Sequence, residues 1–308
     1  MSKWRTITDG LSFPEGPVVC ADGSVIVAEI PIGRLTRVLP DGTKHTLAEV
    51  GGGPNGLAVG PEGLLYVCNN GGMKVREWQG MTIPAGASDD YVGGSIQRVN
   101  TATGAVETLY TEAENAPIRA PNDIVFDAHG GFWFTDNGKS RGRDRDVTGV
   151  FYAKADCSAC REVIFPMAEP NGIGLSPDGA TLYVAETPTA TLWAFDIVAP
   201  GEVALEPSFR RMGGRFVYSP GALKFFDSLA VQNDGAICVA TIGTGGITTV
   251  APDGSSAHFV ATDDPFTTNI AFGGADLRDA YVTLSGTGRL VTRRWAASGL
   301  HLINAASI

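Results

Sequence analysis

The chain has 308 residues, 40 of them glycine, and a formal net charge of −10. The negative charge argues against a nucleic-acid-binding protein, because such proteins present a basic face to the phosphates. No run of about 18 apolar residues occurs, so we expect no membrane-spanning segment. The first residues lead into no apolar stretch, so we expect no secretory signal.

The five cysteines are an odd number and indicate no disulfide framework. We therefore expect a reducing compartment, the cytoplasm. Cys20, Cys68 and Cys238 lie in expected strands and read as small buried apolar residues. Cys157 and Cys160 form a lone C-x-x-C without a second pair or a nearby histidine, which is typical of a structural turn, with a metal or redox site as the alternative.

Residues 1–12 precede the first copy of a unit that repeats along the chain. We expect this segment to contribute a strand that pairs with the last copy. Such pairing closes the ring of repeats and removes an exposed sheet edge.

Each copy of the unit consists of a polar dipeptide, a short apolar strand, a turn and a second apolar strand. In the clearest copy, Pro170-Asn171-Gly172 leads into a strand, and the turn Asp178-Gly179 follows. Asp-Gly between apolar runs strongly predicts a hairpin. Spacing averages about 51 residues, as in four-stranded propeller blades. The copies begin at Pro14-Glu15, Pro54-Asn55, Pro121-Asn122, Pro170-Asn171, Phe226-Asp227 and Thr268-Asn269.

An outer hairpin follows the inner pair in every copy. We expect these hairpins within residues 35–48, 95–110, 150–165, 191–205, 247–260 and 289–303. Six units of four strands use nearly the whole chain, and both halves of the unit repeat together, which an all-β sandwich would match only by chance. The sequence predicts an all-β protein: one six-bladed β-propeller domain over residues 1–308, with four antiparallel strands per blade.

Two insertions lengthen the repeats. Residues 73–92 form either a lid or specificity element or a plain surface loop. Residues 137–147 contain Lys139, Arg141, Arg143 and Arg145 interleaved with aspartates, which is typical of a solvated loop, with the steering of an anionic substrate as the alternative.

The polar residue that opens each inner strand is the candidate functional feature. Inner strands line the central channel of a propeller, so these residues face one another across one of its mouths. Oxygen donors without histidine or cysteine suit a hard cation such as Ca²⁺, Mg²⁺ or Mn²⁺. A single asparagine before a strand is also a common turn residue. The six residues are Glu15, Asn55, Asn122, Asn171, Asp227 and Asn269.

These motifs resemble those of the senescence-marker-protein/gluconolactonase/luciferin-regenerating family. The resemblance rests on residues 13–17, 121–123, 170–173 and 268–274 and covers essentially the whole chain. It implies a six-bladed propeller with one divalent metal in the central channel. It further implies Glu15, Asn171 and Asp227 as metal ligands and Asn122 as a fourth ligand or substrate-binding residue.

The resemblance also implies the chemistry. We expect a lactonase that hydrolyses a small sugar-type or simple aliphatic lactone, with metal polarisation of the ester carbonyl and Asp227 as general base or nucleophile. Calcium is the expected ion, with Mg²⁺, Mn²⁺, Zn²⁺ and Fe²⁺ as alternatives. We expect Asn55, Arg119 and Asp123 to bind substrate. One branch of the family has an arginine where this chain has Ala120, and Arg119 lies one position away.

Two other functions stay open on the sequence. One is hydrolysis of an organophosphate or another ester at the same site. The other is a non-catalytic propeller that binds calcium. Release of fluoride or phenol from an organophosphate would distinguish the first from a lactonase. Metal binding without hydrolysis of any lactone in a panel would indicate the second. The sequence does not indicate an oligomeric state.

Overall fold

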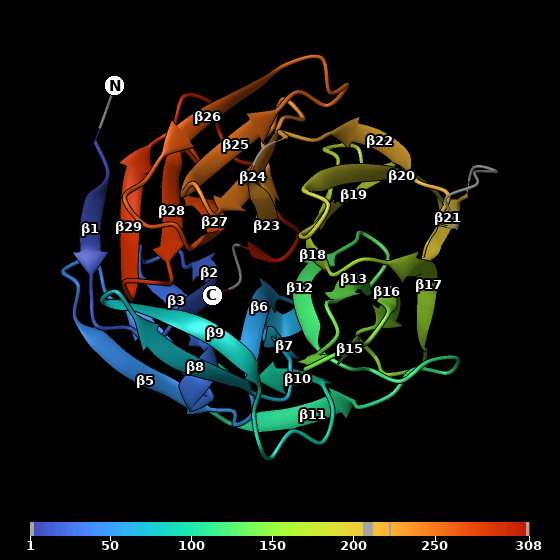
Figure 1. Cartoon of the computed structure of the whole chain (residues 1–308), viewed down its shortest axis with the longest axis horizontal. Coiled ribbons are helices and arrows are strands. Elements are labelled where there is room, and N and C mark those ends of the chain that lie inside the picture. Colours follow the sequence, from blue (N-terminus) through green and yellow to red (C-terminus); the bar gives the residue numbers. More distant parts are fainter. Residues whose placement is uncertain (1–2, 206–211, 222, 306–307) are drawn as a thin grey trace.

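Six antiparallel β-sheets stand around a central channel in the computed structural model, which describes residues 3–205, 212–221, 223–305 and 308 (Figure 1). The innermost strands contact one another in chain order and return to the first, so the sheets form a closed ring. The predicted all-β, six-bladed propeller is confirmed.

Within each blade the four strands lie side by side, in order from the channel outwards. Blade 1 contains β2 (Pro14–Val19), β3 (Val25–Glu29), β4 (Arg34–Val38) and β5 (Lys44–Glu49). Blade 2 contains β6 (Pro54–Val59), β7 (Leu65–Asn69), β10 (Ser95–Val99) and β11 (Val106–Tyr110). Blade 3 contains β12 (Pro121–Phe126), β13 (Gly131–Asp136), β16 (Thr148–Lys154) and β17 (Cys160–Met167).

The second half of the ring repeats this order. Blade 4 contains β18 (Pro170–Leu175), β19 (Thr181–Glu186), β20 (Thr191–Ala199) and β21 (Glu202–Ala204), and β22 (Arg215–Tyr218) also pairs with β20. Blade 5 contains β23 (Phe225–Val231), β24 (Ile237–Ile242), β25 (Gly246–Val250) and β26 (Ala257–Ala261). Blade 6 contains β27 (Thr267–Gly273), β28 (Asp279–Leu284), β29 (Arg289–Arg294) and β1 (Arg5–Thr8).

The N-terminal strand closes the ring, as predicted. β1 is antiparallel to β29, with Arg5 opposite Thr292 and Thr6 opposite Val291. The outer partner predicted for β29 within residues 300–303 is wrong, because β1 already occupies that edge. Residues 296–305 instead cross the far end of the channel, where Leu300 N donates to the carbonyl of Val231 at 2.9 Å.

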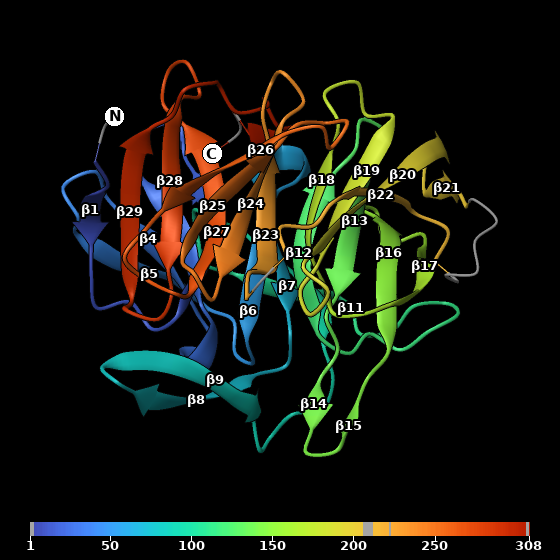
Figure 2. The same ribbon diagram turned by 45° about the horizontal axis from the view of Figure 1, so that its top comes forward.

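Both insertions form hairpins on one face of the ring (Figure 2). β8 (Met73–Trp78) pairs with β9 (Met81–Ala87), and Thr82 N donates to Gly286 O of blade 6 at 2.8 Å. β14 (Ser140–Arg141) pairs with β15 (Asp144–Arg145). The 73–92 insertion therefore reaches from blade 2 to blade 6 over blade 1 and its short 3₁₀ turn η1 (Ile30–Ile32).

The apolar core lies between neighbouring blades, because each sheet buries both faces. Phe132, Trp133 and Phe134 of β13 are 0% exposed, although they point alternately to opposite faces. Phe132 packs against Tyr66 and Phe126 with ring centroids 5.5 and 5.2 Å apart. Aromatic contacts of this kind join blades 2 and 3.

Phe132→Ala should lower the free energy of unfolding by about 3–5 kcal/mol, because it leaves a cavity in this interface. Denaturant unfolding followed by circular dichroism would measure the loss. Phe165→Ala is the matched control, since Phe165 lies on the same blade and is 53% exposed. Equal losses for the two variants would contradict the proposed packing role.

No helix among the described residues is long and apolar enough to cross a membrane. All five cysteines are free, and four of them are buried, whereas Cys157 is exposed.

Candidate metal centre

The inner strand of every blade begins at the same mouth of the channel and carries a β-bulge there. In blade 1 the register of β2 and β3 shifts between Glu15 and Val18, and in blade 5 that of β23 and β24 shifts between Phe226 and Leu229. Corresponding shifts occur in the other four blades. A bulge redirects a side chain away from the ladder, and here it does so at the candidate site residues.

The register also corrects one alignment of the repeat. Thr267 pairs with Leu284 and Ile270 with Val282, which is the same step as Phe226 with Thr241 and Leu229 with Val239. Thr268, rather than Asn269, therefore stands at the position of Asp227. Asn269 occupies the next position, equivalent to Asp123 in blade 3, and each side chain accepts a hydrogen bond from the following backbone N–H.

Glycine follows the polar residue in three blades because neighbouring inner strands approach closely. A Cβ on Gly16 would lie 2.2 Å from Asn55 O, and one on Gly56 would lie 2.4 Å from Asn122 O. A Cβ on Gly172 would lie 2.7 Å from Asp227 O. The glycines thus bring each polar residue next to its counterpart in the following blade, and the Pro-Asn-Gly pattern is explained by this contact.

Glu15, Asn171 and Asp227 lie close enough to interact. Burial raises the pKa of Asp227 well above its usual range, and the nearby Glu15 carboxylate adds to the rise, whereas a hydrogen bond with Asn171 opposes it. Burial also raises the pKa of Glu15, against hydrogen bonds from Asn269 and Thr268. Two carboxylates buried this close repel each other, and a cation between them would relieve the repulsion.

Asp123 lies one layer deeper and faces the same centre. Burial raises its pKa to about 7, and the charge of Glu15 contributes to the rise. Thr135 positions this layer: its hydroxyl accepts from Asp123 N at 3.1 Å and donates to Asn171 O at 2.6 Å. Ser228 Oγ lies 3.4 Å from Asn171 Oδ1. Thr135, Ser228 and Thr268 were not predicted, because their roles depend on contacts between blades.

Asn122 supplies the most specific sign of a ligand. Its Oδ1 is fully buried and has no hydrogen-bond partner among the described residues. An unpaired buried carbonyl oxygen is costly, and a cation at the centre would satisfy it. Within the same described residues, no three His, Cys, Asp or Glu side chains gather as a metal group, so a site here would combine two carboxylates with amide oxygens.

Asn55 and Arg119 differ in how the structure places them. Asn55 is buried at the start of β6, beside Gly16. Arg119 is exposed; its backbone N–H donates to Asp136 and its carbonyl accepts from Tyr91 Oη at 2.7 Å. The charge of Arg119 acts on Asp146 and Tyr91 at the rim. Asn55 therefore lines the mouth, and Arg119 lies at its edge.

Asp136 holds the segment before Asn122 in place. Its carboxylate accepts from the backbone N–H groups of Arg119, Ala120 and Gly138 at 2.6, 2.8 and 2.9 Å. Burial nevertheless raises its pKa from 3.8 to about 6. Because the folded-state pKa is above the unfolded one, this group stabilises the fold most below about pH 4, and that contribution is lost as the pH rises through about 6.

Asp136→Asn should flatten this part of the pH dependence, by up to about 3 kcal/mol between pH 4 and pH 7. Urea unfolding of both proteins at several pH values in that window would measure it. Asp253→Asn changes an exposed turn carboxylate and is the control. An unchanged slope in the Asp136 variant would show that other groups cause the pH dependence.

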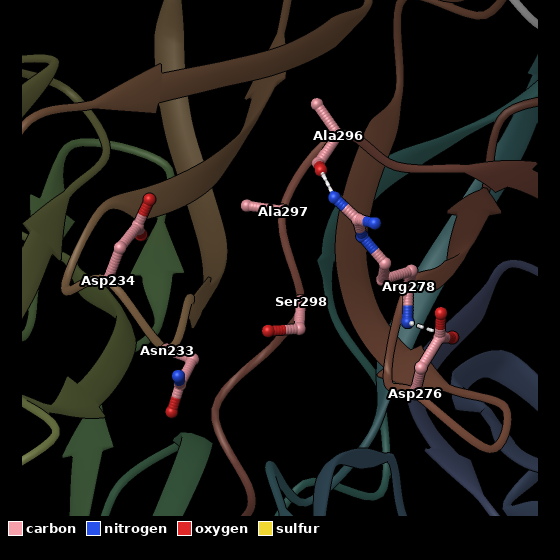
Figure 3. A pocket seen from close by; sticks show the side chains of 7 residues that line it. All are labelled: Asn233, Asp234, Asp276, Arg278, Ala296, Ala297 and Ser298. Atoms are coloured by element: carbon pink, nitrogen blue, oxygen red, sulfur yellow. Dashed lines mark hydrogen bonds between the residues drawn. The ribbon is translucent and has the colours of Figure 1, made fainter.

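A hollow lies between turns of blades 5 and 6, and Figure 3 shows the side chains that line it. Its volume is about 460 Å³, and turn residues of blades 5 and 6, among them Asp234, Asp276 and Arg278, line it together with residues 296–298. These turns join the far ends of β23 and β27, whose near ends carry Asp227 and Thr268. The hollow is therefore separate from the channel mouth that holds the candidate metal ligands.

The family model of the SMP-30/Gluconolactonase/LRE-like region matches residues 13–286. A gluconolactonase of Zymomonas mobilis subsp. mobilis is 22% identical over 280 residues, which cover 83% of this chain and 72% of the relative. Such relatives carry the names of hydrolases that act on lactone ester bonds.

Solved structures show the same fold. A gluconolactonase from Xanthomonas campestris superposes with a TM-score of 0.73 at 21% identity, covering 94% of this chain and 89% of that one. Regucalcin from Agrobacterium tumefaciens, described as a calcium-binding protein, superposes with a TM-score of 0.67 at 18% identity, covering 97% and 95% of the two chains.

Proposed function

Because the chain belongs to the SMP-30/gluconolactonase/LRE-like family, we propose that it is a metal-dependent lactonase acting on a small lactone. The unpartnered Asn122 Oδ1, buried at the position of blade 3 that Glu15 holds in blade 1 and Asp227 in blade 5, carries the proposal that a cation belongs there. The lactonase names of the relatives support the reaction class.

Four side chains would hold the cation: Glu15, Asn122, Asn171 and Asp227. Two carboxylates balance the charge of a divalent ion, and two amide oxygens add neutral donors. An all-oxygen set favours Ca²⁺, and it also accommodates Mg²⁺ or Mn²⁺, with Zn²⁺ and Fe²⁺ less well matched. The regucalcin likeness, a calcium-binding protein by its description, agrees with this preference.

The bound ion would polarise the ester carbonyl and stabilise the negative charge that develops on its oxygen. In one route Asp227 would accept the proton of the attacking water and return it to the ring oxygen as the ester bond breaks. In the other it would attack the carbonyl itself as the ring oxygen leaves, forming an acyl-enzyme that water then hydrolyses. Asn55 and Asp123 border the centre and orient the substrate, and Arg119 at the rim attracts its polar or anionic end. The inner strands fix these groups, so little reorganisation accompanies the reaction.

The test is a pH-indicator assay over aldonolactones and simple γ- and δ-lactones, with each divalent metal added in turn. We expect turnover of at least one class of lactone well above the background rate. Metal binding without hydrolysis across both classes would contradict the proposal and favour a binding protein. Release of fluoride or phenol from an organophosphate, faster than lactone opening, would instead favour an organophosphate hydrolase.

The free cysteines are relevant to the cellular compartment of the protein. Four of the five are buried and reduced in the fold, and disulfides are rare in reducing compartments. We propose a cytoplasmic location on this ground.

A further inference from the structure

The central channel contains a cavity of about 680 Å³, here called the chamber, between the proposed metal centre and the far end of the inner strands. Its roof includes Gly16, Asp123 and Asn269, the residues directly below the mouth. A cavity of this size matches the volume of small-molecule sites, which is about 300–1,000 Å³. The chamber lies on the far side of the proposed metal ligands from the mouth, and Asp123 is the one proposed substrate-binding residue that also lines it.

One layer of the chamber wall consists of small residues. Three positions after the polar residue that opens each inner strand, each of the six blades places a residue on the chamber wall. None of these residues is larger than valine. They are Val18, Ala58, Val125, Gly174, Ala230 and Ala271.

The C-terminal segment forms the floor. Leu300 N donates to Val231 O of blade 5 at 2.9 Å, and Asn304 Nδ2 donates to Val59 O of blade 2 at 3.5 Å. Blades 2 and 5 are opposite each other in a ring of six, so the segment must cross the end of the channel. The last residue, Ile308, then lies against blade 1, where its carbonyl accepts from Ala21 N at 2.9 Å (Figure 1). Its residues on the chamber are Leu300, His301, Leu302, Ile303 and Ala305.

We propose that this chamber binds a small, neutral, largely apolar molecule. Water gains few partners from apolar walls, whereas an apolar ligand releases that water and contacts all six strands. Carboxylates lie at both ends, with Asp123 at the roof and Asp127 and Asp178 at the lower end. They disfavour an anionic ligand such as a fatty acid. Because each carboxylate already accepts hydrogen bonds within the protein, none of them is free to pair with a cationic ligand, which leaves a neutral one.

The probe is N-phenyl-1-naphthylamine, a neutral apolar dye that fluoresces when it leaves water. Titration into the full-length protein should give saturable binding of one probe per chain, displaced by 1-decanol. Ala230→Phe and Ala271→Phe each narrow the chamber and should weaken binding at least tenfold. Ala204→Phe adds the same ring at an exposed site on β21 and should leave the affinity unchanged.

Binding that does not saturate, or an affinity unchanged by both chamber variants, would overturn the proposal. Thermal unfolding checks that the variants fold. If the phenylalanine variants do not fold, the double variant Ala230→Val/Ala271→Val adds less volume and should still weaken binding about threefold or more. Equal affinity for that variant and the parent would also overturn it. Lactone hydrolysis by the same variants is measured separately, so its loss or absence does not decide the question.

Discussion

Asp227→Asn is expected to lower lactone hydrolysis about a thousandfold or more while the propeller stays folded. The change removes a group that accepts a proton or attacks the carbonyl, and a positioned general base alone contributes about 10²–10⁴-fold. Asparagine keeps the size of the side chain and its oxygen. Initial rates with saturating lactone and metal would measure the loss in kcat.

The stability of this variant is informative in its own right. Burial raises the pKa of Asp227, and the charge of Glu15 adds to the rise, so without metal the charged carboxylate is unfavourable. The metal-free variant should therefore be at least as stable as the parent at pH 8. Asp234→Asn, which changes an exposed turn residue of the same blade, should alter neither activity nor stability. Activity within tenfold of the parent would rule out the proposed role of Asp227.

The fold was predictable because its information is local and repeated. Each Asp-Gly or Gly-Gly turn between apolar runs fixes one hairpin, as at Asp178-Gly179, and six copies leave few arrangements other than a ring. The partner of β29 was mispredicted for the opposite reason. Residues 5–8 and 289–294 pair although they are far apart in the sequence, and local pattern does not reveal such pairing. The apolar residues 300–303 have the local pattern of a strand and lie closer in the sequence, so they were predicted in its place.

The candidate site was predictable only in part. Asp227, Asn171 and Glu15 follow the repeat, and the structure brings them into mutual contact or electrostatic range. The prediction that Asn269 is equivalent to Asp227 was wrong. The position of the bulge in β27 makes Thr268 the equivalent residue, and Thr268 has neither a preceding proline nor a following glycine to mark it in the sequence. Contacts between blades, such as Thr135 with Asn171, leave no trace in the spacing.

The insertions show a different limit. Length alone identified residues 73–92 and 137–147 as additions to the blades. Their hairpin structure, and the reach of β9 to Gly286, depend on contacts that a single sequence does not reveal. Lys139 was interpreted as part of a solvated loop, yet its Nζ is buried and donates to Asn70 Oδ1 and Gly72 O at 3.1 and 2.8 Å. These two hydrogen bonds connect the 137–147 loop to residues 70–72, which precede the β8–β9 hairpin.

Removal of divalent metal should abolish hydrolysis and destabilise the protein, because the ion offsets the repulsion between Glu15 and Asp227. Dialysis against a chelator, followed by titration calorimetry with Ca²⁺, should give one site per chain. Free metal about 100-fold above its Kd should stabilise the fold by about 2.7 kcal/mol, which thermal unfolding would detect without any substrate. Activity that survives chelation would contradict the proposed metal dependence.

Asn122→Leu tests whether the unpartnered oxygen faces the ion. Leucine has nearly the same shape and removes a buried oxygen that has no hydrogen-bond partner among the described residues, so the metal-free protein should lose little stability. Its affinity for Ca²⁺ should fall about tenfold or more, because one ligand is gone. Asn233→Leu, at an exposed turn on the opposite face, should bind Ca²⁺ like the parent. If Asn122→Leu also binds like the parent, the oxygen faces something other than the ion, and Glu15, Asn171 and Asp227 must hold the ion without it.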